Sequence, residues 1–145
     1  MAVTAKAYGQ LPLHLWKKLI DWVNDDIRCR LHTSSYTPDQ DTHDFVNDLS
    51  AEIADAGYTA GGQTLTSKTL TYDAPTNTTT LDCADPTWTT VSFTVRTATF
   101  ADQTPGTDAT RPLICYQQDS ANVVSTNGNF VVQINAGGLL TMTAA

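Results

Sequence analysis

One run of sequence, from Gly57 to Asp82, limits most strongly what this chain can fold into. It combines three glycines, at positions 57, 61 and 62, with threonine-rich stretches on either side of Asp73-Ala74-Pro75-Thr76-Asn77. Glycine enters left-handed backbone conformations at little cost, and the branched threonine side chain suits a pleated, half-buried strand. The run carries no evident reactive group. It therefore predicts strands joined by tight turns, and it specifies a shape more clearly than a chemistry.

The period of the apolar residues changes early in the chain. From Leu11 onward they recur at three- and four-residue spacing, which predicts an amphipathic helix over residues 11–24. In residues 27–32 apolar and polar residues alternate strictly, which predicts a strand. The side chains expected to face inward on that strand are Ile27, Cys29 and Leu31.

Six further strands are predicted beyond residue 57, because β-branched and aromatic segments there alternate with turn signals such as Asn127-Gly128-Asn129. Their ranges are 64–72, 78–83, 90–100, 113–117, 129–134 and 139–143. Together the elements predict a mainly β fold, an antiparallel β-sandwich or barrel with an N-terminal amphipathic helix. A chain of 145 residues fits one β-rich domain over residues 11–145, preceded by an N-terminal arm of residues 1–10.

The charge of the chain argues against some kinds of partner. The net charge is −7, and charged residues make up 16% of the sequence, compared with about 25% in an average globular domain. A negative surface repels phosphate, so we expect no direct contact with nucleic acid. No apolar run reaches the roughly 18 residues that a membrane span needs, and residues 1–10 do not resemble a signal peptide. We therefore expect a soluble protein made in a cytosol, with no membrane partner.

No motif in the sequence indicates catalysis or a metal site. The three cysteines show no paired spacing, so we interpret them as small buried apolar residues, with one disulfide as an alternative. The acidic stretch 39–48 begins like a calcium loop, but Asp44 stands at the glycine position and Ser50 at the closing glutamate position. We expect its carboxylates to accept backbone N–H bonds instead. We predict no enzyme, no cofactor and no metal, and no catalytic role for the three histidines.

Six segments of the chain, in this order, carry a family resemblance. They are residues 33–45 (TSSYTPDQDTHDF), 57–62 (GYTAGG), 68–73 (KTLTYD), 82–88 (DCADPTW), 112–116 (PLICY) and 130–140. Together they resemble a group of small tailed-bacteriophage virion proteins, over roughly residues 25–143. The chain departs from that pattern in its cysteines and in residues 11–22, which are longer and more aromatic. The resemblance implies a structural component of the head surface, the neck or the tail, and it implies no catalytic residues.

The resemblance therefore predicts a virion structural protein, made in the host bacterial cytoplasm. A capsid decoration or minor head protein is the leading role, because an acidic β-rich clip repeated by symmetry gains avidity from small contacts. The expected partners are the major capsid protein or other virion proteins, in a homo-oligomer or symmetric array. A neck or tail component and a receptor- or glycan-binding module are the alternatives.

The predicted helix supplies the candidate contact residues. They are Leu11, Leu15, Trp16, Leu19 and Trp22. Trp16 lies off the main apolar stripe, so packing of that stripe alone leaves a large aromatic exposed. Removal of residues 1–23 is expected to weaken incorporation into particles and to leave the β domain folded.

Overall fold

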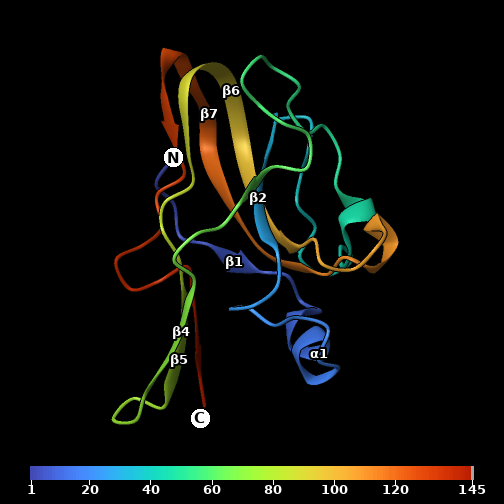
Figure 1. Cartoon of the computed structure of the whole chain (residues 1–145), viewed down its shortest axis with the longest axis vertical. Helices are drawn as coiled ribbons and strands as arrows, with labels where there is room; N and C mark the ends of the chain where they lie inside the picture. Colours follow the sequence, from blue (N-terminus) through green and yellow to red (C-terminus); the bar gives the residue numbers. More distant parts are fainter. Residues whose placement is uncertain (145) are drawn as a thin grey trace.

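The computed structural model describes residues 1–144, which form a mainly β protein with two antiparallel sheets and one short α-helix (Figure 1). The strands are β1 (Lys6–Ala7), β2 (Ile27–His32), β3 (Gln63–Thr64), β4 (Thr69–Asp73), β5 (Thr78–Asp82), β6 (Thr87–Asp102), β7 (Leu113–Val131) and β8 (Leu140–Thr143). Helix α1 spans Leu11–Trp16, and two 3-10 helices span Val46–Asp48 and Asp108–Thr110.

The sheet order confirms an antiparallel, mainly β fold. The larger sheet has the order β1-β7-β6-β2-β3, and the smaller one has the order β4-β5-β8. Within residues 1–144 the two edge strands of the larger sheet, β1 and β3, do not pair with each other, so the sheet stays open. The barrel alternative is therefore wrong.

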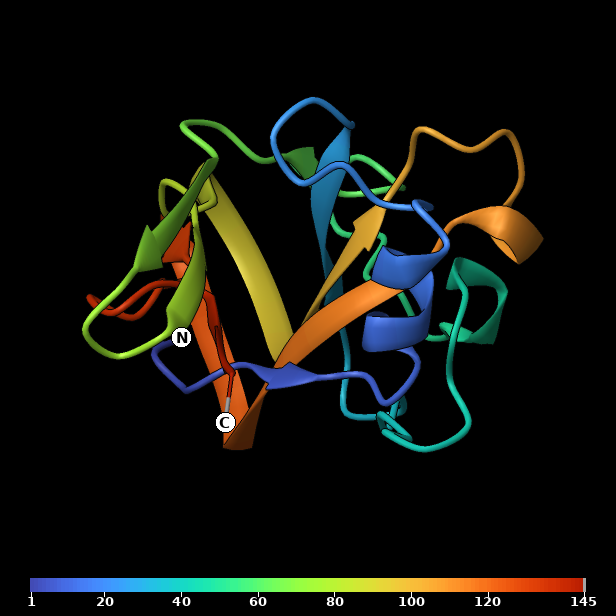
Figure 2. The ribbon, with the colours of Figure 1, turned by 90° about the horizontal axis from the view of Figure 1, so that it is seen from below.

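The larger sheet is built around one long antiparallel pair, β6 and β7, whose curvature is visible in Figures 1 and 2. Pairing runs from Thr87 opposite Val131 to Ala101 opposite Leu113. Four register shifts interrupt it, and each such irregularity bends a strand and increases its twist. Strand β2 then pairs along the second half of β6, from Ile27 opposite Asp102 onward.

Burial along β6 shows that the larger sheet is covered on one face at one end and on both faces at the other. In the first half, Val91, Phe93 and Val95 are buried and alternate with exposed neighbours, as predicted. From Thr97 to Asp102 every residue is buried. The reason is a second apolar cluster on the outer face, formed partly by the segment between β2 and β3. Its members are Tyr8, Val46, Ala101, Leu113 and Tyr116.

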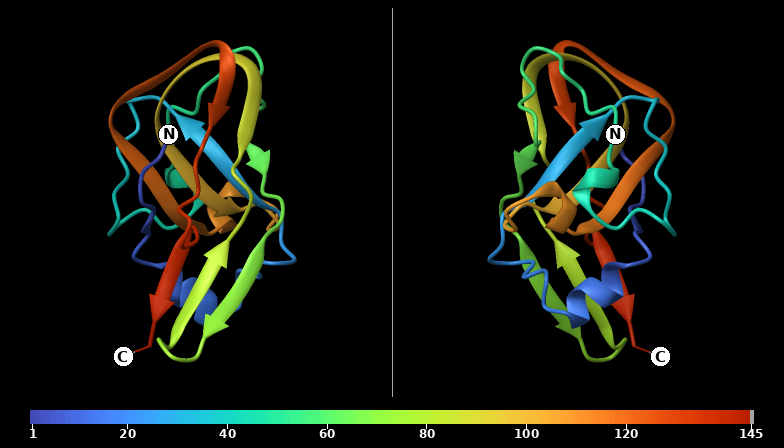
Figure 3. Two further views of the ribbon diagram at one scale, coloured as in Figure 1. Left: turned by 90° about the vertical axis from the view of Figure 1, so that its left-hand side faces the viewer. Right: turned by 90° about the vertical axis from the view of Figure 1, so that its right-hand side faces the viewer.

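The smaller sheet shares the main hydrophobic core with the larger one. Leu81, Cys83 and Leu139 belong to the same buried cluster as Cys29 and Phe100. Beyond this shared core the β4–β5 hairpin projects from the body of the molecule (Figures 1 and 3). The hairpin tip and the outer part of the small sheet therefore have fewer neighbours than the rest of the fold.

The predicted helix over residues 11–24 is too long, because α1 ends at Trp16. Lys18 has a φ of 57°, a left-handed conformation that stops the helix. The chain then turns, which brings Ile20 and Trp22 into the core. The Trp22 indole N–H also donates to the carbonyl of Thr69 at 2.9 Å. Burial of these large side chains outweighs the modest gain from continuing a helix.

Two strand predictions also need correction. The predicted strand 64–72 is divided between β3 and β4, which belong to different sheets, and Ser67 between them has a φ of 53°. The predicted strands 113–117 and 129–134 are parts of the single strand β7, except for the last three residues. The expected turn at Asn127 lies inside β7, because β6 continues to provide a pairing partner and the register shifts absorb the irregular residues.

Residues 1–10 lie against the larger sheet. Lys6 pairs with Tyr116 on β7, and the amino group of Met1 donates to the carbonyl of Val131 at 3.0 Å. Tyr8 is fully buried, with its hydroxyl 2.8 Å from that of Tyr36. Because this segment completes both pairing and packing, we no longer expect the β domain to stay folded when residues 1–23 are removed.

Gly62 is a position where the fold tolerates no side chain. Its φ is +77°, and an added Cβ would lie 2.1 Å from the carbonyl oxygen of Cys29 on β2. We expect Gly62→Ala to lower the free energy of unfolding by roughly 2–4 kcal/mol, because the backbone must shift. Gly106→Ala is the control, since nothing lies within 4 Å of its added Cβ. Denaturant unfolding measures the free energy of unfolding of both variants. Equal losses in the two would contradict a special requirement for glycine at position 62.

Candidate functional site

Exposed large apolar side chains gather at one end of the molecule. Eight are exposed among residues 1–144, and seven of them belong to α1, to the segment after it, or to the smaller sheet. These seven are Leu13, Trp16, Leu19, Val23, Leu70, Tyr72 and Met142. Figures 1 and 3 show α1 and the smaller sheet at the same end of the molecule, where Leu15 of α1 and Met142 of β8 line one recess. A contiguous group of exposed apolar side chains marks an interaction surface far better than scattered single residues do.

The smaller sheet owes its apolar face to strand alternation. Leu70 and Tyr72 lie on one face of β4, opposite Leu81 and Thr79 of β5, while Met142 lies opposite Thr79 from β8. Successive residues of a strand point to opposite faces, so the threonines between them share the other face. Leu81 is buried, whereas Leu70 is 52% exposed and Tyr72 62% exposed. The apolar face is therefore covered at Leu81 on the middle strand β5 and open at Leu70 and Tyr72 on the edge strand β4.

A groove separates this apolar face from α1. Its larger recess has a volume of about 570 Å³, and its smaller recess has a volume of about 360 Å³. Leu15 and Met142 line both recesses, so we treat them as one surface, the α1–sheet groove. Trp16 borders the smaller recess, and two charged residues, Lys18 and Asp21, line the larger one. The groove is thus apolar with one charge of each sign.

The predicted contact residues divide into two groups in the structure. Leu11 and Trp22 are buried in the core, although Trp22 also lines the larger recess of the groove. Leu15 is half-buried in the groove, Leu19 is 38% exposed and Trp16 is 87% exposed. The sequence analysis missed the small-sheet residues.

Leu70, Tyr72 and Met142 alternate with threonine in T-L-T-Y-D and L-T-M-T. This alternation was the available signal for an apolar sheet face. It predicts such a face but not that the face stays uncovered.

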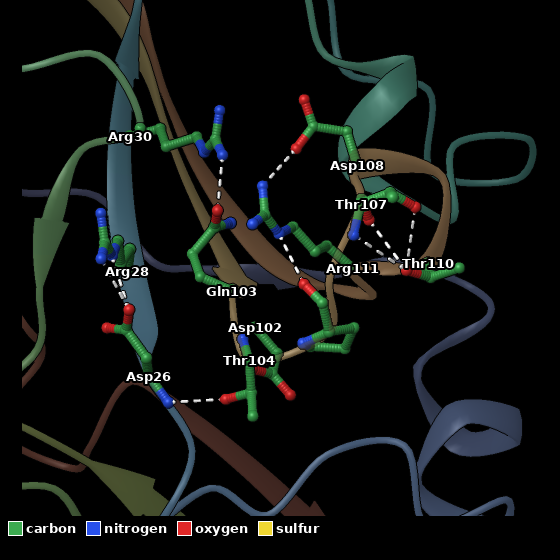
Figure 4. A network of polar contacts seen from close by, with 12 residues as sticks. Asp26, Arg28, Arg30, Asp102, Gln103, Thr104, Thr107, Asp108, Thr110 and Arg111 are labelled. Atoms are coloured by element: carbon green, nitrogen blue, oxygen red, sulfur yellow. Dashed lines mark hydrogen bonds and ion pairs between the residues drawn. The ribbon is translucent and has the colours of Figure 1, made fainter.

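A second concentration of polar groups is a cleft of about 420 Å³ lined by three of the four arginines (Figure 4). Each arginine is paired with an acid. The pairs are Arg28–Asp26 at 2.7 Å, Arg30–Glu52 at 3.2 Å and Arg111–Asp108 at 2.7 Å. The hydrogen bond from Arg28 lowers the pKa of the Asp26 carboxyl. Three cations against three anions leave this arginine cleft without net charge.

The acids of the arginine cleft are also engaged by other groups of the protein. Glu52 accepts hydrogen bonds from the Tyr58 hydroxyl and from the N–H of Gly61 at 2.8 Å. Arg30 donates to Gln103 at 2.8 Å, which ties β2 to the connection after β6. The network therefore holds loops to the sheet, and its charges are neutralised by ion pairs within the chain.

The acidic stretch 39–48 is held by backbone hydrogen bonds, as predicted for its carboxylates. Asp39 accepts from the N–H groups of Asp41 at 2.9 Å and Thr42 at 3.1 Å. Asp48 accepts from the N–H of Asp44 at 2.9 Å. Within residues 1–144, no three His, Cys, Asp or Glu side chains are grouped to hold a metal ion.

The cysteines and His32 are packing residues. Cys29, Cys83 and Cys115 are all buried and free, which confirms their interpretation as small apolar residues. Cys29 and Cys115 both lie opposite Phe100, from the strands on either side of it, and are therefore two strand spacings apart. His32 is bonded between Ser50 and Thr99, and burial lowers its pKa to about 4, so the ring is neutral at pH 7.

No protein-family model, curated protein or solved structure matches this chain. Among residues 1–144, no helix is both long and apolar enough to cross a bilayer.

The burial of Arg30 predicts a large cost for breaking its ion pair. Its side chain is 9% exposed, and Glu52 would keep a partly buried charge without its cation. We expect Arg30→Met to lower the free energy of unfolding by about 2–4 kcal/mol. Arg111→Met, which removes a more exposed pair, should cost no more than about 1 kcal/mol. Urea unfolding at pH 7 tests both, and a larger loss for Arg111→Met would contradict this ranking.

Asp102 predicts a pH dependence of stability. Burial raises the pKa of its carboxyl to about 6, against hydrogen bonds from Thr104 and with a further rise from nearby Asp25. The folded state thus binds this proton more tightly than the unfolded state does. Its contribution to the free energy of unfolding is favourable below about pH 4 and is lost as the pH rises through about 6.

Asp102→Asn should remove this dependence while keeping an oxygen to accept the Thr104 N–H, which lies 2.7 Å away. We expect the variant to be more stable than the parent at pH 7.5 by roughly 1–2 kcal/mol, and to lose most of that advantage at pH 4.5. Chemical unfolding at both pH values measures the difference. An advantage that does not change with pH would show that Asp102 does not titrate in this range.

Proposed function

We propose that this chain is a structural protein of a tailed-bacteriophage virion, in the role of a capsid decoration or minor head protein that stabilises the shell through contacts with other subunits. The observation that carries the proposal is the exposed apolar surface around the α1–sheet groove. Trp16, 87% exposed, and its neighbours on the small sheet remain uncovered in the isolated chain. An acidic protein that keeps such a surface is suited to a permanent place in an assembly.

The rest of the molecule supports a structural role. Both sheets contribute side chains to one core, and we propose that they form a sandwich that acts as the rigid body carrying the groove. The arginine cleft has its charges internally paired, and the buried His32 ring is bonded on both sides within the chain. The resemblance to small virion proteins and the net charge of −7, which suits an outer face away from packaged DNA, agree with this role.

Particles that lack the chain provide the direct test. We expect the purified protein to co-sediment with them and to saturate at on the order of hundreds of copies per particle, as decoration of a lattice requires. Binding should also raise the temperature at which the particles release DNA. Trp16→Glu should reduce the copies bound, while Val124→Glu, at an exposed apolar residue of β7 away from the groove, should not.

The copy number separates the alternatives. Saturation at about 6 or 12 copies would indicate a neck or tail component and contradict the decoration role. Binding to host cells or glycans, with no binding to particles, would indicate a receptor-binding module. No association with particles and no copies in purified virions would overturn the proposed function altogether.

A further inference from the structure

The α1–sheet groove is open in the isolated chain, and its shape, charge and area indicate what covers it. We propose that it binds the same groove of a second copy of this chain, giving a two-fold symmetric dimer with Trp16 as the central anchor. The inference rests on the proposed function, in which this surface is covered within an assembly, and it names the partner at that site.

The first argument is shape. Trp16 protrudes with 87% of its surface exposed, directly beside the recess of about 360 Å³ that it lines together with Pro12, Leu15 and Met142. A two-fold axis makes one surface patch face its own copy. The protruding indole of each copy can then enter the recess of the other. A surface that offers both a projection and a neighbouring recess is self-complementary, which a plain groove is not.

The second argument is charge. The whole chain carries −7, which opposes unspecific self-association. The groove is different, because Lys18 and Asp21 line it with one charge of each sign. A nearly neutral patch on an acidic protein permits a second copy to approach there.

The third argument is area. Trp16, Leu70 and Met142 line the groove, and together with the four other exposed apolar residues of these elements they present on the order of 700 Å² of accessible surface. A two-fold contact that covered all seven would remove roughly 1,400 Å² in total. Stable specific interfaces bury about 1,200–2,000 Å². A contact over all seven residues would thus reach the size of a dimer interface.

The two edge strands of the small sheet, β4 and β8, both contribute side chains to the same patch. Within the sheet order β4-β5-β8, the strands β4 and β8 are both edges, and both carry exposed apolar side chains of the groove, Leu70 on β4 and Met142 on β8. Exposed apolar edge strands are normally covered or blocked, because they invite pairing with other chains. A second copy bound at the groove would cover the apolar side chains that both edge strands contribute.

Sedimentation velocity of the purified full-length protein tests the inference without any other virion component. Between about 1 and 200 µM, a range that spans micromolar dissociation constants, the wild-type protein should shift from monomer to dimer and stop there. Trp16→Glu should weaken dimerisation at least about tenfold, because an anchor at the centre of an interface carries much of its energy. Its exposure in the monomer predicts an unchanged circular dichroism spectrum and melting temperature.

Val124→Glu is the matched control, since it introduces the same charge at an apolar residue that is 63% exposed on β7. It should dimerise like the wild type. Leu70→Lys, on the opposite side of the groove from α1, should weaken dimerisation as Trp16→Glu does, although it places the opposite charge there. A Trp16→Glu protein that dimerises like the wild type would overturn the assignment of the interface.

Tryptophan fluorescence gives an independent readout. Of the three tryptophans only Trp16 is exposed, because Trp22 is 4% and Trp88 is 8% exposed. Quenching by acrylamide should therefore report mainly on Trp16 and should decrease as the protein concentration rises. Quenching that is independent of concentration would contradict burial of Trp16 in a dimer.

The outcomes separate this inference from the proposed function. A wild-type protein that stays monomeric at 200 µM overturns the inference. If that monomer still binds particles, and Trp16→Glu abolishes the binding, another virion protein covers the groove and the proposed function stands. If the protein dimerises through the groove but never associates with particles, the dimer inference is supported and the virion role is refuted.

Discussion

The pairing of β6 with β7 is the interaction on which the rest of the structure depends. These two strands, 16 and 19 residues long, provide the surfaces on which β2 and β1 pair and on which both apolar clusters form. The contacts are long-range in sequence, and they become favourable only after the loop between the strands has closed. Once the pair is formed, each register shift bends it and increases its twist.

The same constraint explains where sequence patterns predicted the fold correctly and where they did not. Alternation at Val91, Phe93 and Val95 was reliable, because that segment faces the core on one side only. On β2 the predicted inward side chains are buried, but Arg30 and His32 on the other face are buried as well. It could not show that residues 97–102 are buried on both faces, since this depends on a covering segment far away in the sequence. Turn propensity at Asn127 was outweighed because β6 still offered a partner there.

Tertiary packing likewise decided the end of α1. Spacing alone placed Leu11, Leu15, Leu19 and Trp22 on one helical stripe. In the structure Lys18 takes a left-handed conformation and Trp22 packs into the core with its N–H bonded to Thr69. This change separates residues that the sequence pattern had grouped together. Two of the five predicted contact residues, Leu11 and Trp22, are therefore buried, while Trp16 stays exposed beside a recess. The predicted continuous helix gave no sign of this recess.

The exposed surface is best understood as a consequence of how the small sheet is attached. Only its inner end, at Leu81 and Leu139, joins the shared core, so the apolar side of the hairpin extends beyond what the chain itself can cover. The chain also places an exposed tryptophan, Trp16, at the same end. An exposed apolar surface of this kind is stabilised most simply when a partner covers it. Because the groove is nearly neutral although the chain carries a net charge of −7, a second copy of the chain is a suitable partner.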